Sequence, residues 1–178
     1  MQYKIHAHNL QNEILRFNAG NRVYLSGCVY TARDVAHKRF IKHIAASREL
    51  PVVLNGAVIF YVGPTPHFSR LVRAAGPTTF GRTLQLLDLD VTAMTGKGER
   101  APYVIESMKK NRTVYFSAVG GAGDLASRHI VGCREIAFAN LGCEFIKELT
   151  PEEIPLIVAI DCCGNSVFWN ALSKLKKV

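Results

Sequence analysis

A chain of 178 residues that is 48% hydrophobic and 20% charged can bury the core of a folded domain, so an intrinsically disordered protein is excluded. The formal net charge of +8 and the pI near 9.4 favour an anionic partner: a nucleic acid, an anionic lipid surface or a small acidic substrate. No stretch reaches the apolar length that spans a bilayer, so we expect no membrane segment and a single domain over residues 1–178.

The N-terminus and the cysteines indicate the compartment. The first residues lack the apolar run and cleavage site of a secretory signal, so we expect a cytoplasmic protein. The five cysteines are odd in number, include the adjacent pair Cys162 and Cys163, and form no CxxC motif. This pattern argues against a disulfide framework and against a zinc or iron–sulfur site within this chain. We therefore expect reduced thiols and no metal ligand here.

The first half of the chain alternates between predicted strands and one helix. Residues 3–8 alternate like a short strand, and residues 22–30 are rich in strand formers. From Asp34, whose charge suits a first turn, apolar residues recur four apart among lysines and arginines, which predicts an amphipathic helix ended by Pro51. The stretch VVLNGAVIFYVG predicts either a buried strand or a tight hairpin about Asn55-Gly56.

The second half continues the alternation. A short segment reaches Leu87, a strand follows at 91–94, TGKGER is a turn, and Ala101-Pro102 opens a helix to about residue 110. TVYFSAV predicts a strand, and GGAGDLASRHI predicts a glycine-rich loop that leads into a helix. REIAFAN and PLIVAIDCCGNSVF predict the last two strands, and the second of them should bend at residues 163–165. A helix from Phe168 follows. Because strict βαβ regularity is missing, we expect a compact three-layer α/β domain with a mixed sheet.

Four loops are rich in small residues, and the first three of them also carry a cation or a hydroxyl: SGCVYTARDVAHKR, GPTTFGR, TGKG and AVGGAGD. Each follows a predicted strand, and ligands of α/β sheets gather beyond the carboxyl ends of strands, so the loops could converge on one pocket. Arg33, Arg82 and Lys97 would then bring three positive charges together. Arginine clamps carboxylates in a bidentate manner, and three cations without an anion are costly to bury, so this set suits a dicarboxylate.

Each loop alone also has an ordinary structural interpretation. Arg33 could pair with Asp34 on a solvated helix face, and Arg82 could be a surface charge in a turn. Lys97 stands between glycines without the spacing of a P-loop. His37 fits a helix surface or a satisfied core position better than a ligand. The GGAG run could cradle an anion or could only permit tight helix packing.

Taken together, SGCVYTARDVAHKR, NGAVIFYVGP, GPTTFGR, GKG and FSAVGGAGDL closely resemble the β part of iron–sulfur hydro-lyases of the fumarate/tartrate type. The resemblance runs from about Arg22 to Phe168, and IPLIVAIDCCGNSVF is similar to the closing segment of that family. There the β part is either the C-terminal domain of a class I fumarase or a separate β subunit, and the early first motif resembles the separate subunit. The resemblance implies a swivelling β/β/α-type domain and reversible hydration of a dicarboxylic acid.

The same resemblance implies a division of roles. The family's [4Fe–4S] cluster is held by three cysteines of the α part, so it implies an α-subunit partner, a hetero-oligomer such as α2β2, and no cluster ligand in this chain. Arg33 and Arg82 would grip the substrate carboxylates, with Lys97 as a third cationic contact. Thr78 matches the residue proposed as the base that removes the proton from carbon, and Asp34 would orient Arg33 or a neighbouring hydroxyl.

The leading hypothesis is the β subunit of a class I fumarate hydratase, and the alternative within the family is the β subunit of an L-tartrate dehydratase. The sequence departs from the family after Arg82, where Thr83 and Leu84 replace the usual Met and acidic residue, and the segment from Arg82 to Lys97 is shorter. These departures affect the distal substrate contacts. A non-catalytic module that binds anions or nucleic acid is the third hypothesis, since residues 33–48 could form a basic helix face, but the motif loops lack an aromatic platform for stacking bases.

Overall fold

The computed structural model describes residues 1–32, 34–61, 63–67, 70–75, 83–118, 127–137 and 146–169, with the backbone alone at residues 34, 63–67, 70–75 and 83. Most strands join one nine-stranded sheet in the order β1-β2-β11-β8-β7-β4-β3-β10-β9. These strands are β1 (Gln2–His6), β2 (Arg22–Ser26), β3 (Val29–Thr31), β4 (Val58–Phe60), β7 (Ala93–Gly96), β8 (Val114–Ala118), β9 (Ile130–Ala137), β10 (Ile146–Pro151) and β11 (Ile154–Ile160).

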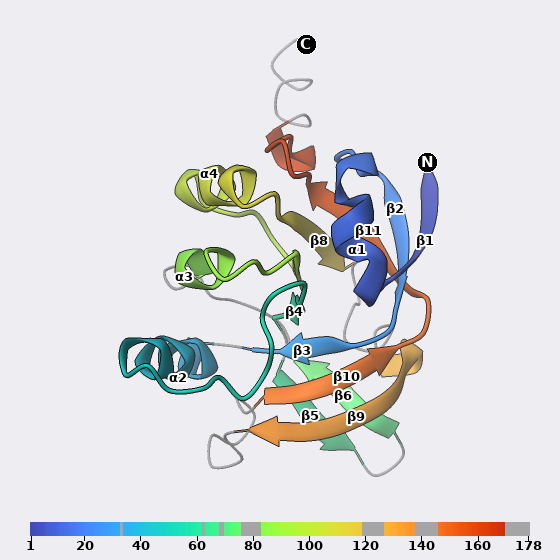
Figure 1. Cartoon of the computed structure of the whole chain (residues 1–178). Coiled ribbons are helices and arrows are strands. Elements are labelled where there is room, and N and C mark those ends of the chain that lie inside the picture. Colours follow the sequence, from blue (N-terminus) through green and yellow to red (C-terminus); the bar gives the residue numbers. More distant parts are fainter. Residues whose placement is uncertain are drawn as a thin grey trace.

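The helices are short, and most of them lie on one side of this sheet. They are α1 (Leu10–Glu13), flanked by the 3-10 turns Ala7–Asn9 and Ile14–Arg16, then α2 (Asp34–Ala45), α3 (Thr83–Leu87) and α4 (Pro102–Lys110). Figure 1 shows α2, α3 and α4 stacked along one side, with α1 on the other. A separate two-stranded hairpin consists of β5 (Gly63–His67) and β6 (Arg70–Ala75). None of the helices in the described ranges is long and apolar enough to cross a bilayer.

The sheet is mixed because a parallel centre is flanked by antiparallel strands. β3, β4, β7 and β8 pair in parallel, and β10 and β11 border this group in the antiparallel sense. Side chains of the central strands alternate between two buried clusters: Val58 and Phe60 belong to one and Ile59 to the other. Both faces of the parallel centre are therefore covered, as parallel strands require.

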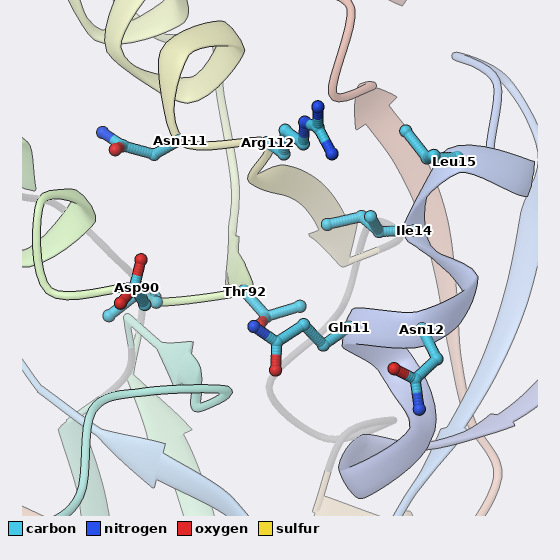
Figure 2. Close-up of a pocket in the computed structure, with 9 residues that line it drawn as sticks. Gln11, Asn12, Ile14, Leu15, Asp90, Thr92, Asn111 and Arg112 are labelled. Atoms are coloured by element: carbon cyan, nitrogen blue, oxygen red, sulfur yellow. The ribbon is translucent and has the colours of Figure 1, made fainter.

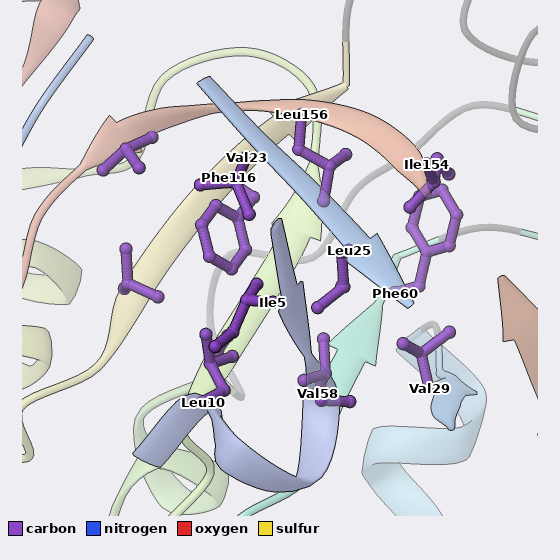
Figure 3. Packing of buried hydrophobic residues seen from close by; sticks show 14 of the residues in the cluster. Ile5, Leu10, Val23, Leu25, Val29, Val58, Phe60, Phe116, Ile154 and Leu156 are labelled. Carbon is purple, nitrogen blue, oxygen red and sulfur yellow. The ribbon is translucent and has the colours of Figure 1, made fainter. Parts of the chain in front are cut away.

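The two clusters define three layers. In the first cluster, Ile5 and Leu25 from β1 and β2 are buried together with Val58 and Phe60 from β4, and Figure 3 shows these two arms of the curled sheet facing each other. The second cluster lies between the outer face of the sheet and the three stacked helices. It includes Phe40 of α2. Two β layers and one helical layer confirm the predicted three-layer α/β domain with a mixed sheet.

Several predicted elements differ in detail. The strand expected over residues 22–30 is split at Gly27, whose φ of +99° belongs to the left-handed region that glycine adopts most easily. Asn55-Gly56 forms a turn and not a hairpin, because β4 begins only at Val58 and pairs in parallel with β3 and β7. The β5–β6 hairpin and β10 are additional strands that the sequence patterns did not indicate.

The bend predicted after β11 is confirmed, and Asp161 stabilises it. This carboxylate is 2% exposed, and it accepts hydrogen bonds from the backbone N–H groups of Cys163 and Asn165, both at 3.0 Å. It also accepts one from the Asn165 amide at 2.9 Å and one from the backbone N–H of Ala19 at 3.2 Å. Asp161 therefore joins the closing segment to the turn that precedes β2.

We expect Asp161→Ala to lower the free energy of unfolding by about 3 kcal/mol, because several part-buried hydrogen bonds to this carboxylate would be lost. Urea denaturation of the purified chain measures this change. Glu152→Ala, at an exposed turn carboxylate, is the control and should alter stability by about 0.5 kcal/mol or less. Equal stability of the two variants would show that the Asp161 bonds carry no net stabilisation.

Candidate functional site

The candidate site lies at the edge of the sheet where four parallel strands end. Thr31 of β3 pairs with Phe60 of β4, Phe60 with Thr95 of β7, and Thr95 with Phe116 of β8. This row lies at or close to the carboxyl end of each strand. Thr31 and Phe60 are the last residues of β3 and β4, Thr95 is one residue before the end of β7, and Phe116 is two residues before the end of β8. Beyond the carboxyl ends of such strands lies the usual ligand position of α/β sheets.

All four motif loops depart from this edge. The TARD segment follows β3, TGKG follows β7, and AVGGAGD follows β8. GPTTFGR begins after Ala75, which pairs with Gly63, and only residues 61 and 62 separate Gly63 from the end of β4. The structure therefore confirms that each of the four segments follows a strand: three leave from strands of the row, and GPTTFGR follows β6 of the hairpin, whose last residue pairs with Gly63 close to the end of β4.

The predicted site residues are described to different extents. Lys97 lies in the turn after β7, and its side chain is exposed to solvent. Asp34 is the first residue of α2, where its backbone alone is described. Arg33, Thr78 and Arg82 lie outside the described residues. Lys97 is accordingly the one predicted cation whose place at the edge can be given, and the roles of all five residues stay predictions.

A group of buried polar side chains lies directly below this edge and was not predicted. We call Arg100, Tyr61, Tyr115, Thr95 and His37 the Arg100 cluster; each is 2% exposed or less. The guanidinium carbon of Arg100 lies 4.1 Å from the centre of the Tyr115 ring and 5.4 Å from that of Tyr61. The His37 ring lies 5.4 Å from the Tyr61 ring. His37 is thus a core residue of α2, the second of the two positions considered for it.

Gly96 allows this cluster to approach the backbone of β7. A Cβ atom at position 96 would lie 3.0 Å from Nη2 of Arg100 and 3.2 Å from the Tyr115 hydroxyl oxygen, closer than side chains usually tolerate. Burial raises the pKa of Tyr115 to about 12, although the positive charge of Arg100 lowers it in part. Tyr115 therefore stays neutral near pH 7 and is not a general base there.

The closing segment of the chain contacts the same turn. Trp169 donates a hydrogen bond from Nε1 to Oε1 of Glu99 at 2.7 Å, across a sequence separation of 70 residues. Glu99 lies between Gly98 and Arg100, so this bond ties the end of the described chain to the turn that carries Lys97. The turn is thereby fixed by tertiary contacts and not by its own sequence alone.

A hollow lies at the amino ends of β7 and β8, away from the candidate site. It has a volume of about 290 Å³ and is lined by α1, by the residues before β7 and by those before β8, with Gln11, Thr92 and Arg112 among them. Figure 2 shows these side chains around the amino ends of the strands. Lys97, the predicted site residue whose side chain the structure describes, does not line it. This hollow is therefore separate from the candidate site.

The described cysteines do not suit a cluster in this chain. Cys28 precedes β3, Cys133 lies in β9, and Cys162 and Cys163 follow β11, and all four are free thiols. In the part of the chain that the structure describes, no three His, Cys, Asp or Glu side chains gather as metal ligands would. Burial raises the pKa of Cys28, Cys133 and Cys162 above the ordinary value, which disfavours the thiolate that binds iron.

Comparison with known proteins gives the family. A model of the fumarase C-terminus family matches residues 1–171. The chain belongs to this family. It is 30% identical over 176 residues to a protein of Methanocaldococcus jannaschii named "Putative L(+)-tartrate dehydratase subunit beta", covering 93% of this chain and 90% of that protein.

Two further members of the fumarase C-terminus family are much longer than this chain. The anaerobic class I fumarate hydratase of Escherichia coli K12 is 29% identical over 169 residues, which are 91% of this chain and 31% of that protein. Fumarate hydratase 2 of Leishmania major is 29% identical over 172 residues, which are 92% of this chain and 30% of that protein. The chain thus spans about a third of the length of these two relatives.

The raised pKa of Cys28 predicts slow alkylation of this thiol. Although Cys28 is an exposed residue, partial desolvation of its thiol raises the pKa above the ordinary 9.0, so at pH 7.5 less thiolate should be present in the native chain than in the chain unfolded in urea. Iodoacetamide labelling from pH 7 to 10, followed by peptide mass spectrometry, should show a native rate that rises at higher pH than the unfolded control. Equal native and unfolded profiles would contradict the burial effect.

Proposed function

We propose that this chain is the β subunit of a class I [4Fe–4S] fumarate hydratase, which interconverts fumarate and malate. The observation that carries the proposal is the row across β3, β4, β7 and β8, because the TARD, TGKG and AVGGAGD segments leave from its strand ends and GPTTFGR follows a hairpin that begins three residues after β4. Membership of the fumarase C-terminus family supports it. In this proposal the chain acts as one domain that provides half of an active site.

The residues of this chain bind the dicarboxylate and move the proton. Lys97, exposed at the edge, binds one carboxylate together with Arg33 and Arg82, and Asp34 orients Arg33. Thr78 takes the proton from the carbon next to a carboxylate. Because that carbon is a very weak acid, the three cations must stabilise the aci-carboxylate group that forms, which carries two negative charges, and such preorganised charge is often the largest catalytic contribution.

The remaining part of the active site belongs to a partner. The described cysteines do not suit a cluster, so in the proposal an α subunit binds the [4Fe–4S] cluster, which supplies the Lewis acid for the substrate oxygens. The length of the fumarate hydratase relatives supports this arrangement, since about two-thirds of each lies outside the match. We propose a cytoplasmic hetero-oligomer such as α2β2, with free thiols that suit a reducing compartment.

One observation favours a second substrate. The M. jannaschii relative, which carries the tartrate dehydratase name, matches this chain over 90% of its own length, so the two chains are of similar size. An L-tartrate dehydratase β subunit, which would form oxaloacetate, is therefore the alternative function. Malate and L-tartrate are both hydroxy dicarboxylates, so the same cations could bind either one.

We expect the isolated chain to be colourless and inactive, and the complex with its α partner to hydrate fumarate. The test is coexpression of the two subunits, an iron count, and assays with fumarate, malate and L-tartrate, with the β subunit alone as the control. Turnover by the iron-free chain alone would contradict the proposal. Efficient use of tartrate without malate would replace fumarate hydratase by the alternative.

Substitutions should separate the base from the substrate-binding cations. Thr78→Ala should lower kcat of the complex by roughly 10²- to 10⁴-fold with a small change in KM, because a general base is lost. Lys97→Ala should raise KM for malate by roughly tenfold, because a charge-assisted contact is lost.

Lys110→Ala is the matched control for Lys97. Lys110 is an exposed lysine at the end of α4, near the amino ends of the central strands, and it pairs with Asp88. Its loss should leave kcat and KM unchanged. Full turnover by the Thr78→Ala complex would assign the base to another residue. An effect of Lys110→Ala equal to that of Lys97→Ala would reduce the role of Lys97 to general surface charge.

A further inference from the structure

We propose that His6 and His8 form a two-histidine site for a divalent transition-metal ion of the Zn²⁺ type. The site goes beyond the proposed function and does not depend on it, because it lies outside the row of strands from which the motif loops depart. β1, which ends at His6, forms the margin of the nine-stranded sheet, and β2 and β11 separate it from β8.

The chain folds so that the two histidines face each other. His6 is the last residue of β1, and His8 lies in the 3-10 turn Ala7–Asn9 that follows. The centres of their rings are 4.2 Å apart, and the ring planes are inclined by 58°. Nδ1 of His8 contacts Nδ1 of His6 at hydrogen-bonding range. Both residues are exposed, so the two nitrogens meet at the surface of the protein.

Gly27 provides the space for the His6 ring. Ser26 pairs with His6 in the sheet, and Gly27 follows it directly. A Cβ atom at position 27 would lie 2.7 Å from Nδ1 and from Nε2 of His6, closer than real side chains approach. The His6 ring therefore rests on the backbone between β2 and β3, and this contact keeps it beside His8.

A contact between two Nδ1 atoms is one that a metal ion can replace. In the hydrogen-bonded pair, one nitrogen donates a proton and the other accepts it. In the tautomer that carries its proton on Nε2, each ring offers a lone pair at Nδ1, and the two lone pairs then meet at one place. Imidazole nitrogen suits Zn²⁺, Cu²⁺ and Ni²⁺, whereas Mg²⁺ and Ca²⁺ prefer oxygen ligands. The pair therefore selects a transition-metal ion.

The exposed position allows the coordination to be completed. Tetrahedral Zn²⁺ with Zn–N bonds of about 2.0 Å requires its nitrogens to be about 3.3 Å apart, and small rotations of two exposed side chains provide this separation. Among the described residues no third His, Cys, Asp or Glu joins the pair, so water occupies the other two positions. Lys4 lies two residues before His6, but its charge is paired with Glu153 at 2.7 Å and opposes the cation little.

A bound ion would join the end of an edge strand to the turn that leads into α1. In the described sheet β1 pairs with β2 alone, so its carboxyl end is held by one neighbouring strand. A ligand that binds the folded chain and not the unfolded chain raises the stability of the fold. Metal binding should therefore be measurable as thermal stabilisation as well as by calorimetry.

The test is calorimetry with Zn²⁺ on the full chain at pH 7.5, purified without a histidine tag and with its thiols reduced. We expect His6→Gln and His8→Gln each to weaken binding at this site by roughly a hundredfold, because the second ligand no longer acts within the same molecule. His43→Gln, at a histidine in the last turn of α2, is the matched control and should keep the wild-type affinity.

Thermal unfolding gives a second measurement. Zn²⁺ at a hundred times the dissociation constant should raise the Tm of the wild-type chain and of His43→Gln by about 5 °C relative to the same shift in the two other variants. Because all four proteins contain the same cysteines, any Zn²⁺ held by thiols contributes equally to each. Mg²⁺ at the same concentration should give no difference between the four proteins.

Nuclear magnetic resonance of the ¹⁵N-labelled histidine rings identifies the ligating atoms. Zn²⁺ should move the Nδ1 signals of His6 and His8 together, with one ion per chain, and leave the ring signals of His43 in place. Unchanged Nδ1 signals of His6 and His8 would overturn the inference, and so would equal Zn²⁺ affinity in the wild type and both variants. Loss of binding in only one of the two variants would also overturn it, because a pair requires both rings. The hydration assays of the complex are independent of these results, so either proposal can fail without the other.

Discussion

The register of four parallel strands is the constraint on which the rest of the structure depends. Thr31, Phe60, Thr95 and Phe116 form one row across β3, β4, β7 and β8, although 85 positions separate the first from the last. Because side chains alternate along each strand, a slip by one residue would exchange the two buried faces and expose apolar side chains. The two hydrophobic clusters therefore fix the row, and the row fixes where the motif loops begin.

Local patterns were enough to predict the elements that depend on local sequence. The four-residue spacing after Asp34 predicted α2, and Pro102 predicted the start of α4. For VVLNGAVIFYVG the sequence left a buried strand and a hairpin open, and the structure has the buried strand β4, with Asn55-Gly56 as the turn before it. The strand order, which joins β3 to β10 and β2 to β11, depends on contacts between distant residues that no local pattern encodes.

In the candidate site, too, local sequence predicted some features, and contacts between distant residues decided others. The glycines around Lys97 predicted an exposed turn after a strand, and the structure has one. Arg100 ends the polar run TGKGER, and such a run favours a solvated side chain. It is buried because it packs against Tyr61, which follows β4, and Tyr115 of β8, and these two strands flank β7 in the sheet. Its burial results from tertiary packing, so composition and periodicity could not reveal it.

The net charge of +8 has a different meaning after the structure is known. Several exposed cations pair with carboxylates, as Lys4 does with Glu153 and Arg134 with Glu148, and such surface pairs contribute little to stability or recognition. In the proposed function, what matters for a dianion is where positive charge stands relative to the strand ends, and Lys97 is exposed at that edge. A protein with the same total charge and no cation at this edge would attract anions to its surface without holding one in a defined orientation, and orientation is what proton removal from a single carbon requires.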